Sequence, residues 1–411
     1  MSYKISGSYR HWTRYTLTYF IPIQRYTTDN HPMANVLIIS SRTGGGHQSA
    51  ACALQDGFGT LSGTVLVRIL QVLEDGSWLT SKLVDFYNYL LRHKQHYMKY
   101  YYWWINFFRP NESLMILAPA FRKGRQWLER YAPDMIVSVH PMTHHFFSYV
   151  LKRLGLTQTV PMVAVVTDPC GGFWKGWACD GVQHYYVATQ AARQQLMDYN
   201  VAETRITVVG MPVHPKFKPV SDDAKLQLRK TLGLKPELFT VLVNAGWVGG
   251  GNITRLLQAL CDERESLPIQ VIYLCGKNRP MAREGKKMVL KALFPVKVMS
   301  HCNDMEQLMQ ASDVMVSKLG GLTTFEALAC NLPILADTLT DPMPQEAETA
   351  GFLKSTGTGL LLKEPTDLAL HLKTLLTHPE YWQAMRAAAA HHHPPNATHA
   401  IVNAILERMA G

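Results

Sequence analysis

Short apolar runs alternate with longer segments of helical periodicity along most of the chain. Short runs rich in β-branched residues are typical of buried strands, and the longer amphipathic segments between them are typical of helices. The runs expected to form strands fall into two series: Asn35–Ser40, Val65–Ile69, Met135–Val139, Met162–Thr167, His184–Ala188 and Ile206–Val209, then Phe239–Asn244, Gln270–Leu274, Val296–Met299, Val314–Val316 and Ile334–Ala336. This alternation predicts an α/β fold with parallel sheets covered by helices on both faces.

A proline-rich segment separates the two series of runs. Gly210–Asp223 contains Pro212, Pro215 and Pro219, which interrupt regular structure, so we expect a linker between two domains there. The expected segments are a basic N-terminal arm or an over-long start at 1–32, a first domain at 33–215, a second domain at 216–390 and a closing helix at 391–411.

The composition is that of a protein with a large core. Of 411 residues, 47% are hydrophobic and only 18% are charged, which excludes a disordered or collagen-like chain. The apolar runs are far shorter than the roughly 18 residues of a membrane-spanning helix, so we expect no transmembrane span. The seven cysteines are scattered and form no Cys-x-x-Cys pair, which favours reduced thiols in an intracellular protein over disulfides or a zinc site.

The positive charge is concentrated in one aromatic segment. The chain has a formal net charge of +10, of which residues 82–130 carry +6 and residues 1–32 carry +3. Residues 86–109 hold 11 of the 41 aromatic residues and no acidic residue. An amphipathic helix with aromatic and cationic faces is expected to lie in a bilayer interface and to bind anionic lipids. The side chains expected at the membrane are Tyr97, Tyr100, Trp103, Trp104, Phe107, Phe108, Lys94 and Lys99.

Two other interpretations of this segment exist. A core helix is less favoured, because each buried Tyr hydroxyl and Trp indole N–H would need a hydrogen-bond partner. Aromatic rings beside cations also bind single-stranded nucleic acid, but we expect no nucleic-acid partner here.

A glycine-rich turn follows the first predicted strand. Gly44, Gly45 and Gly46 would let a ligand approach the backbone and meet amide groups at a helix N-terminus. The turn matches neither a nucleoside-triphosphate P-loop nor the Gly-x-Gly-x-x-Gly dinucleotide pattern. His47, which comes next, would be able to take a proton from a hydroxyl nucleophile. The alternative is a histidine that caps or packs the helix.

Two more polar residues follow predicted strands of the first series. Asp168 would orient or polarise His47 or bind a substrate hydroxyl, and its alternative role is to cap the following loop. His140 adds a polar group to the same sheet edge, and we interpret it as structural. The first domain therefore has a candidate catalytic edge.

The second half has glycine turns of its own. The turn after Phe239–Asn244 is expected to hold a diphosphate, and the turn after Val314–Val316 precedes a helix with Glu326 expected in its first turn. A carboxylate there would accept a ribose diol, or it would simply complement the helix dipole. The residues expected at this second site are Gly246, Gly249, Gly250, Gly251, Gly320, Gly321, Thr323, Glu326, Gln345 and Glu346.

The order of these motifs resembles glycosyltransferase family 28, specifically the group of monogalactosyldiacylglycerol synthases and processive diacylglycerol glucosyltransferases. The motifs are Thr43-Gly44-Gly45-Gly46-His47, Ser138-Val139-His140-Pro141, Val166-Thr167-Asp168 with Phe173-Trp174-Lys175, Val209-Gly210-Met211-Pro212-Val213, Cys275-Gly276-Lys277-Asn278, Ser317-Lys318-Leu319-Gly320-Gly321, Glu326-Ala327-Leu328 and Pro344-Gln345-Glu346. The resemblance covers roughly residues 34–375.

The resemblance implies a GT-B architecture, in which two Rossmann-like domains face each other across a cleft, with neither a metal ion nor a cofactor. It implies a UDP-sugar in the second domain, with the Gly246 turn at its phosphates, His301 and Cys302 near the uracil, and Thr323 and Glu326 at phosphate and ribose. It likewise implies Gln345 and Glu346 at the transferred sugar, His47 as the base, and the aromatic segment as the membrane-docking element.

The implied activity is an inverting transfer of glucose or galactose from a UDP-sugar to diacylglycerol, at the cytoplasmic face of a membrane. Pro169-Cys170-Gly171-Gly172 and Ala347-Glu348-Thr349 depart from the family pattern, so the sugar and the lipid stay open. The alternatives are an N-acetylglucosaminyltransferase with a polyprenyl-linked acceptor, a UDP-sugar epimerase, a nucleic-acid-binding protein and a membrane-anchored UDP-sugar-binding protein without catalysis.

Overall fold

The computed structural model describes residues 34–410 except 44, 94–96, 247–248 and 395, so the predicted N-terminal arm at 1–32 lies outside the described residues. The strands of the first sheet are β1 (Ala34–Ser40), β2 (Val65–Gln71), β3 (Met135–Ser138), β4 (Met162–Val165), β5 (His184–Val187) and β6 (Ile206–Val208). Those of the second are β7 (Phe239–Asn244), β8 (Ile269–Leu274), β9 (Val296–Met299), β10 (Val314–Ser317), β11 (Ile334–Asp337) and β12 (Gly359–Leu362).

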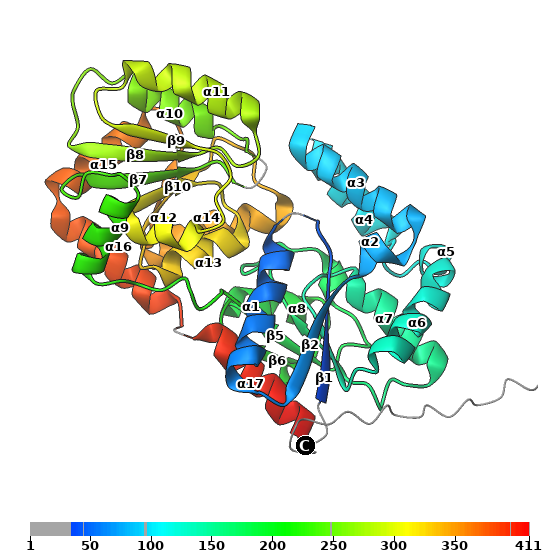
Figure 1. Ribbon diagram of the computed structural model, residues 1–411. Coiled ribbons are helices and arrows are strands. Elements are labelled where there is room, and N and C mark those ends of the chain that lie inside the picture. Colours follow the sequence, from blue (N-terminus) through cyan, green and yellow to red (C-terminus); the bar gives the residue numbers. More distant parts are fainter. Residues whose placement is uncertain (1–33, 44, 94–96, 247–248, 395, 411) are drawn as a thin grey trace, which may run out of the picture.

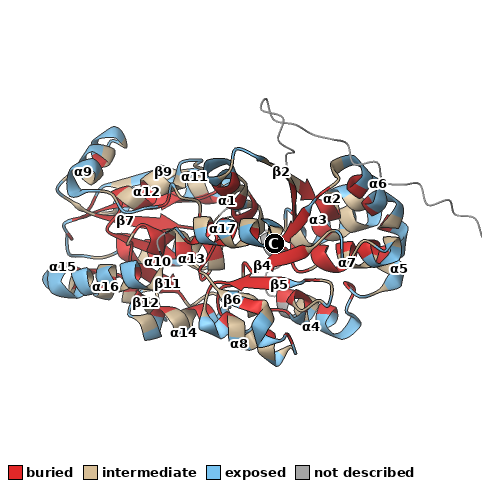
Figure 2. Ribbon diagram, turned by 90° about the horizontal axis from the view of Figure 1, so that it is seen from below, coloured by how far each residue is buried: buried red, intermediate tan, exposed pale blue. Residues whose placement is uncertain are grey.

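Within these residues the strands form two six-stranded sheets in which every pairing is parallel. Their orders are β2-β1-β3-β4-β5-β6 and β12-β11-β10-β7-β8-β9. Helices cover both faces of each sheet, and the central strands between them are buried (Figure 1, Figure 2). The predicted α/β fold of two parallel-sheet domains is therefore confirmed.

The helices of the first domain are α1 (Gly46–Leu61), α2 (Val72–Gly76), α3 (Trp78–His93), α4 (Met98–Phe108), α5 (Leu114–Leu117), α6 (Phe121–Tyr131), α7 (Thr143–Leu154) and α8 (Gln190–Asp198). Those that follow are α9 (Asp222–Thr231), α10 (Ile253–Cys261), α11 (Arg279–Met288), α12 (Met305–Ala311), α13 (Gly321–Ala329), α14 (Ala347–Thr356), α15 (Asp367–Thr377), α16 (Pro379–His392) and α17 (Ala397–Ala410).

The structure differs from the sequence expectation in two places. Strand β12 was not predicted, because its Gly-Leu-Leu-Leu run has no β-branched residue to distinguish it from a helix. The helix expected over 86–109 consists of two helices, α3 and α4. Leu90 of α3 and Met98 of α4 belong to one buried cluster, while residues 94–96 between the two helices lie outside the described residues.

The C-terminal helix returns to the first domain. Ile401, Val402 and Ile405 of α17 are fully buried against β1 and α1 (Figure 1). The Thr398 hydroxyl donates to the carbonyl oxygen of Val213 in the segment between the domains, at 2.6 Å. The chain thus connects the two domains at two points, after β6 and after α16.

A buried ion-pair network fixes the second domain where the linker enters it. The carboxylate of Asp313, just before β10, accepts hydrogen bonds from the Thr240 amide at 2.7 Å, from Lys225 at 2.7 Å and from Arg229. Asp313 and Arg229 are each 6% exposed. Helix α9 is thereby held to the central strands β7 and β10.

Replacing this carboxylate should destabilise the protein strongly. We expect Asp313→Asn to lower the free energy of unfolding by about 3–5 kcal/mol, because the Arg229 cation stays buried without its counter-charge. Urea unfolding measures this loss. The matched control is Asp262→Asn, on an exposed carboxylate that pairs with Gln258, which should change stability by less than about 0.5 kcal/mol. Equal effects of the two variants would contradict a structural role for Asp313.

Candidate active site

The two domains meet where their helix N-termini converge. Helix α1 begins at Gly46 after β1, and α13 begins at Gly321 after β10. A Cβ atom on Gly46 would lie 3.7 Å from Leu322 Cβ, and one on Gly321 would lie 2.7 Å from Pro169 Cδ in the opposite domain. Ligands of parallel α/β sheets bind at this carboxyl edge of the strands, so the junction is the candidate site.

His47 lies in the first turn of α1 with one nitrogen fixed. Its Nδ1 is 2.8 Å from the carbonyl oxygen of Val139 and 2.8 Å from the hydroxyl of Thr167. Because a carbonyl only accepts, Nδ1 carries the proton and Nε2 keeps a free lone pair. Burial lowers the pKa of His47 to about 4, although the hydrogen bond to Val139 opposes this shift. The imidazole is therefore neutral at pH 7 and able to accept a proton.

His140 packs against His47. The two rings meet edge to face with centroids 4.5 Å apart. The amide of Met142 donates to His140 Nδ1 at 3.2 Å, so Nε2 holds the proton and donates to the Thr43 hydroxyl at 2.7 Å. Burial lowers the pKa of His140, and the neighbouring His47 and His144 lower it further. The sequence placed both histidines at this edge, and the structure brings them into contact.

Asp168 lies in the same site but does not orient His47. Its Oδ2 accepts a hydrogen bond from the Trp177 indole at 2.7 Å, and in the described chain no hydrogen bond joins it to His47. The ring of His47 is oriented by Val139 and Thr167, which corrects the prediction that Asp168 orients it. Burial raises the pKa of Asp168 to about 7, the Trp177 hydrogen bond opposes the shift, and Glu346 adds to it.

One pocket unites these residues with the second domain. It has a volume of about 510 Å³, including its open mouth, and its walls include His47, His140 and Asp168 together with Gln345. Gln345 Oε1 is buried and has no partner among the described residues. Beside it, burial raises the pKa of Glu346, while Lys318 opposes the shift. The walls of the pocket thus combine a neutral imidazole, the carboxyl group of Asp168 and the side chain of Gln345.

The glycine turn after β7 needs glycine by its backbone angles. Gly246, Gly249 and Gly251 have φ values of 79°, 70° and 73°, a region that favours glycine. Gly250, which lies between the last two, has a φ of 159°. A Cβ atom on Gly249 would lie 2.5 Å from the carbonyl oxygen of Cys275. Helix α10 follows this turn, with Asn252 as its N-cap.

Lys318 is a site residue to which the sequence analysis assigned no role. A Cβ atom on Gly246 would lie 3.7 Å from Lys318 Cε and 3.9 Å from its Nζ, so the lysine stem covers the glycine turn. Lys318 also lines a small pocket with Asp337, Thr340 and Glu346. A cation beside a glycine turn is what a diphosphate requires, and its position directly after a strand was the available signal.

Helix α13 places Glu326 in its second turn, not in its first as expected, because the helix begins at Gly321. Glu326 therefore does not complement the helix dipole. Burial raises its pKa to about 8, with Lys216 opposing and Glu306 adding to the shift. Thr323 lies in the first turn, and Gly320 is the N-cap, where a Cβ atom would lie 3.8 Å from Glu346 Oε1.

The remaining predicted residues are placed as follows. His301 and Cys302 lie in the loop between β9 and α12, where His301 is exposed and Cys302 packs on the second domain's core. Gly45 is the N-cap of α1. Gly44, Lys94 and the side chain of Lys99 lie outside the described part of the chain.

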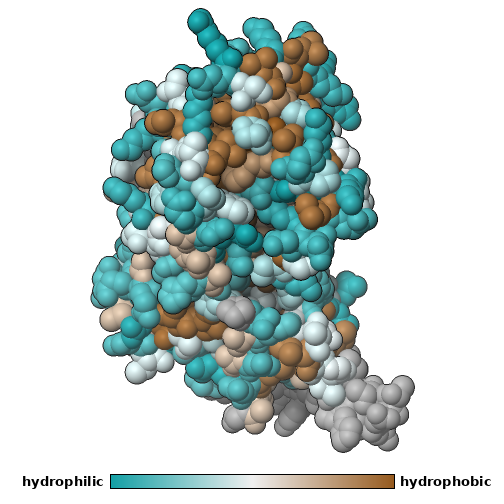
Figure 3. Space-filling view, turned by 90° about the vertical axis from the view of Figure 1, so that its left-hand side faces the viewer, coloured by the Kyte–Doolittle hydropathy of each residue, from teal (hydrophilic) through white to brown (hydrophobic). Residues whose placement is uncertain are grey.

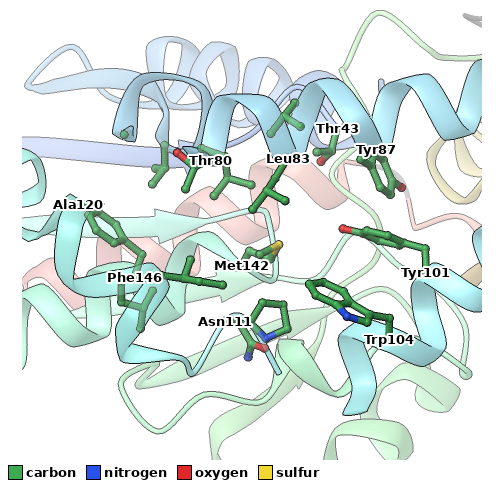
Figure 4. Close-up of a pocket in the computed structure, with 17 residues that line it drawn as sticks. Thr43, Thr80, Leu83, Tyr87, Tyr101, Trp104, Asn111, Ala120, Met142 and Phe146 are labelled. Atoms are coloured by element: carbon green, nitrogen blue, oxygen red, sulfur yellow. The ribbon is translucent and has the colours of Figure 1, made fainter. Parts of the chain in front are cut away.

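An apolar cavity adjoins the pocket. Its volume is about 760 Å³, including its mouth, and α2, α3, α4, α5 and α7 contribute to its walls (Figure 4). Cavity and pocket share four lining residues, Thr43, Tyr87, Tyr101 and Met142. The two spaces are therefore adjacent.

An aromatic surface lies outside this cavity. Its members Tyr97, Tyr100, Trp103, Trp104, Phe107 and Phe108 are all exposed on and beside α4. The rings of Trp103 and Phe107 stack at 5.7 Å. Figure 3 shows a different face of the molecule, the one on the left of Figure 1. On that face, hydrophobic and hydrophilic side chains are mixed.

Two features are absent from the residues that the structure describes. No helix there combines the length and the apolar character needed to cross a bilayer. In the same residues no group of three or more His, Cys, Asp or Glu side chains is arranged to hold a metal ion.

Solved structures with this fold are distant in sequence. Acinetobacter baumannii MurG superposes with a TM-score of 0.63 at 15% identity, over 92% of this chain and all of that one. Anabaena Alr3699/HepE in complex with UDP-glucose gives 0.56 at 16%, over 91% and 99%. These neighbours establish the GT-B fold.

Sequence comparisons identify the family. Residues 47–213 match the family model for monogalactosyldiacylglycerol (MGDG) synthase. Residues 247–400 match the family model for the glycosyltransferase family 28 C-terminal domain. The probable chloroplastic monogalactosyldiacylglycerol synthase 2 of Oryza sativa subsp. japonica is 32% identical over 82% of this chain and 72% of its own length. The chloroplastic monogalactosyldiacylglycerol synthase 3 of Arabidopsis thaliana is 31% identical over 81% and 72%. The chain therefore belongs to the monogalactosyldiacylglycerol synthase family of glycosyltransferases.

Proposed function

We propose that this protein transfers galactose or glucose from the corresponding UDP-sugar to the hydroxyl of diacylglycerol, with inversion at the anomeric carbon. The observation that carries the proposal is His47, whose Nε2 is unprotonated in a pocket that both domains line and that adjoins an apolar cavity. The names of the relatives favour galactose as the sugar and diacylglycerol as the acceptor.

The donor would lie on the second domain, without a metal ion or a cofactor. The Gly246 turn, Lys318 and the N-terminus of α13 would bind the diphosphate, because they combine amide donors with a cation. We assign the ribose to Glu326 and the uracil to the loop of His301 and Cys302. Thr323 would contact the diphosphate from the first turn of α13.

The reaction would be a single displacement. The acceptor oxygen attacks the anomeric carbon, its proton passes to His47 Nε2, and the bond from that carbon to the diphosphate oxygen breaks with its electron pair leaving on UDP. The side chains of Gln345, which lines the pocket, and of the adjacent Glu346 would accept hydrogen bonds from the sugar hydroxyls. Fixed donors at the diphosphate would stabilise the charge that develops there.

The acceptor would come from a membrane surface. The exposed aromatic surface on α4 suits the interface of a bilayer, and diacylglycerol would pass from there through the apolar cavity to His47. We propose peripheral attachment at the cytoplasmic face. The seven free cysteines support this face, because thiols stay reduced in the cytosol. Anionic lipids would match the positive charge of residues 82–130.

The direct test uses vesicles of diacylglycerol and phosphatidylglycerol with UDP-galactose, UDP-glucose or UDP-N-acetylglucosamine. We expect a monohexosyl diacylglycerol by mass spectrometry and a β-anomeric linkage by proton NMR. His47→Ala should lower kcat by roughly 10²–10⁴-fold with UDP binding unchanged, because only the base is lost. The exposed His378→Ala is the control. Sugar-nucleotide epimerisation that needs no lipid, or no product from any donor, would contradict the proposal.

The ionisation of Asp168 should appear in the pH profile. We expect the ionised form of Asp168 to accept a hydrogen bond from a substrate hydroxyl. The value of kcat/KM should therefore fall as the pH drops through about 7, where Asp168 takes up a proton. Asp168→Asn should be less active and should lack this inflection. Asp198→Asn, on an exposed carboxylate of α8, should retain it. An unchanged inflection in Asp168→Asn would assign it to another group.

The aromatic surface should control membrane binding. We expect the double variant Trp103→Ser with Phe107→Ser to bind phosphatidylglycerol vesicles at least about tenfold more weakly, because two large apolar side chains no longer insert. Vesicle co-sedimentation measures this. The matched control replaces the exposed Leu290 and Leu293 of the second domain by serine and should bind as the unchanged protein does. Equal binding of both double variants would place the membrane contact elsewhere.

A further inference from the structure

One loop of the second domain buries a side chain in the first domain. Met343 precedes the 3₁₀ turn Pro344–Glu346 and is 5% exposed, although the two residues before it are exposed. It belongs to a buried cluster with Leu90 of α3 and Met98 of α4, which we call the Met343 cluster. The loop therefore places its one buried residue among side chains of the opposite domain.

The Met343 cluster lies behind the wall of the active-site pocket. Tyr87, Tyr101 and Tyr102 pack against the cluster, and all three also line the pocket. Figure 4 shows Tyr87 of α3 and Tyr101 of α4 at the same end of the apolar cavity, and their ring centroids are 5.5 Å apart. Gln345, two residues after Met343, lines the same pocket from the second domain. The same tyrosines therefore border both the cluster and the pocket.

The backbone of the turn connects Met343 to the two residues that follow Pro344. Met343 is the N-cap of the turn, and its carbonyl oxygen accepts a hydrogen bond from the Glu346 amide at 2.8 Å. A 3₁₀ turn closed in this way is tight, so its members do not shift separately. The packing of the Met343 side chain therefore constrains where the side chains of Gln345 and Glu346 lie.

The turn meets the first domain at a second place as well. A Cβ atom on Gly172, in the loop after β4, would lie 3.3 Å from the carbonyl oxygen of Pro344. Within its own domain the loop is held further back, at Thr340, whose hydroxyl donates to Asp337 Oδ2 at 2.6 Å. The turn thus packs against the first domain through the Met343 cluster and beside Gly172.

We propose that Met343 is a positioning residue for the donor sugar. By anchoring the turn on α3 and α4, it sets Gln345 and Glu346 for hydrogen bonds to the sugar hydroxyls. This inference rests on the proposed function, which assigns the sugar to these two residues. Galactose and glucose differ only in the direction of one hydroxyl, so choosing between them requires hydrogen-bonding groups in fixed positions. The diphosphate and the uracil are assigned to other loops, so Met343 should affect the choice of sugar and not the binding of UDP.

The experiment measures kcat/KM for UDP-galactose and for UDP-glucose, with diacylglycerol in phosphatidylglycerol vesicles. The ratio of the two values does not depend on how much of a variant is folded, because both donors meet the same enzyme. We expect the unchanged protein to prefer one donor by at least about tenfold. Met343→Ala should bring the ratio close to one, because displaced polar groups no longer distinguish the two hydroxyl directions. The inhibition constant of UDP should stay the same, because UDP has no sugar to position.

Three further variants test the assignment. Met98→Ala removes the side chain that α4 contributes to the cluster and should also reduce the preference. Met343→Leu, which nearly keeps the side-chain volume, should retain the preference. The matched control is Met288→Ala, because Met288 of α11 is 6% exposed in the core of the second domain. This variant should lose stability, as Met343→Ala does, and still keep the preference.

The outcomes separate this inference from the proposed function. A preference that Met343→Ala leaves unaltered, or an unchanged protein that uses both donors equally, would overturn the role of Met343. An equal loss of preference in Met288→Ala, or weaker inhibition of Met343→Ala by UDP, would overturn it too, because either result indicates a general structural effect. Absence of transfer from either donor by the unchanged protein would instead overturn the proposed function.

Discussion

The close approach of two helix N-termini is the constraint on which the rest of the site depends. Gly46 and Gly321 open α1 and α13, and a Cβ atom on Gly321 would collide with the ring of Pro169 in the other domain. The absence of a side chain on Gly321 lets the carboxyl edges of the two sheets approach each other here. His47 and Gln345, 298 positions apart in the chain, consequently line the same pocket. Neither domain alone assembles this set of groups.

Burial then determines the charge of each group in the pocket. It lowers the pKa of His47 to about 4 and raises that of Asp168 to about 7, so at pH 7 the imidazole is neutral and the nearby carboxyl group is only partly ionised. A low density of fixed negative charge suits a site for an anionic donor. The Val139 carbonyl adds the directional element, because it fixes which nitrogen of His47 is free.

The part of the first domain that is proposed to bind lipid consists mainly of apolar surface, with few polar atoms. Helices α3 and α4 bury Leu90 and Met98 inward and leave Trp103 and Phe107 exposed outward. Between this surface and His47 lies the apolar cavity. The elements proposed for membrane attachment, acceptor binding and proton transfer thus lie in neighbouring parts of the first domain.

The sequence by itself determined the parallel α/β fold, the two domains and most strand positions, because hydrophobic periodicity and turn glycines are local signals. It also placed His47, His140 and Asp168 together at the carboxyl edge of the first sheet, since each follows a strand. It missed β12, the break between α3 and α4, the role of Thr167 and the position of Lys318 beside Gly246. Only the tertiary structure decided that Val139 and Thr167 orient His47, and that Met343 packs among residues of the opposite domain. Hydrogen-bond partners and burial depend on residues distant in the chain, and local patterns carry no information about them.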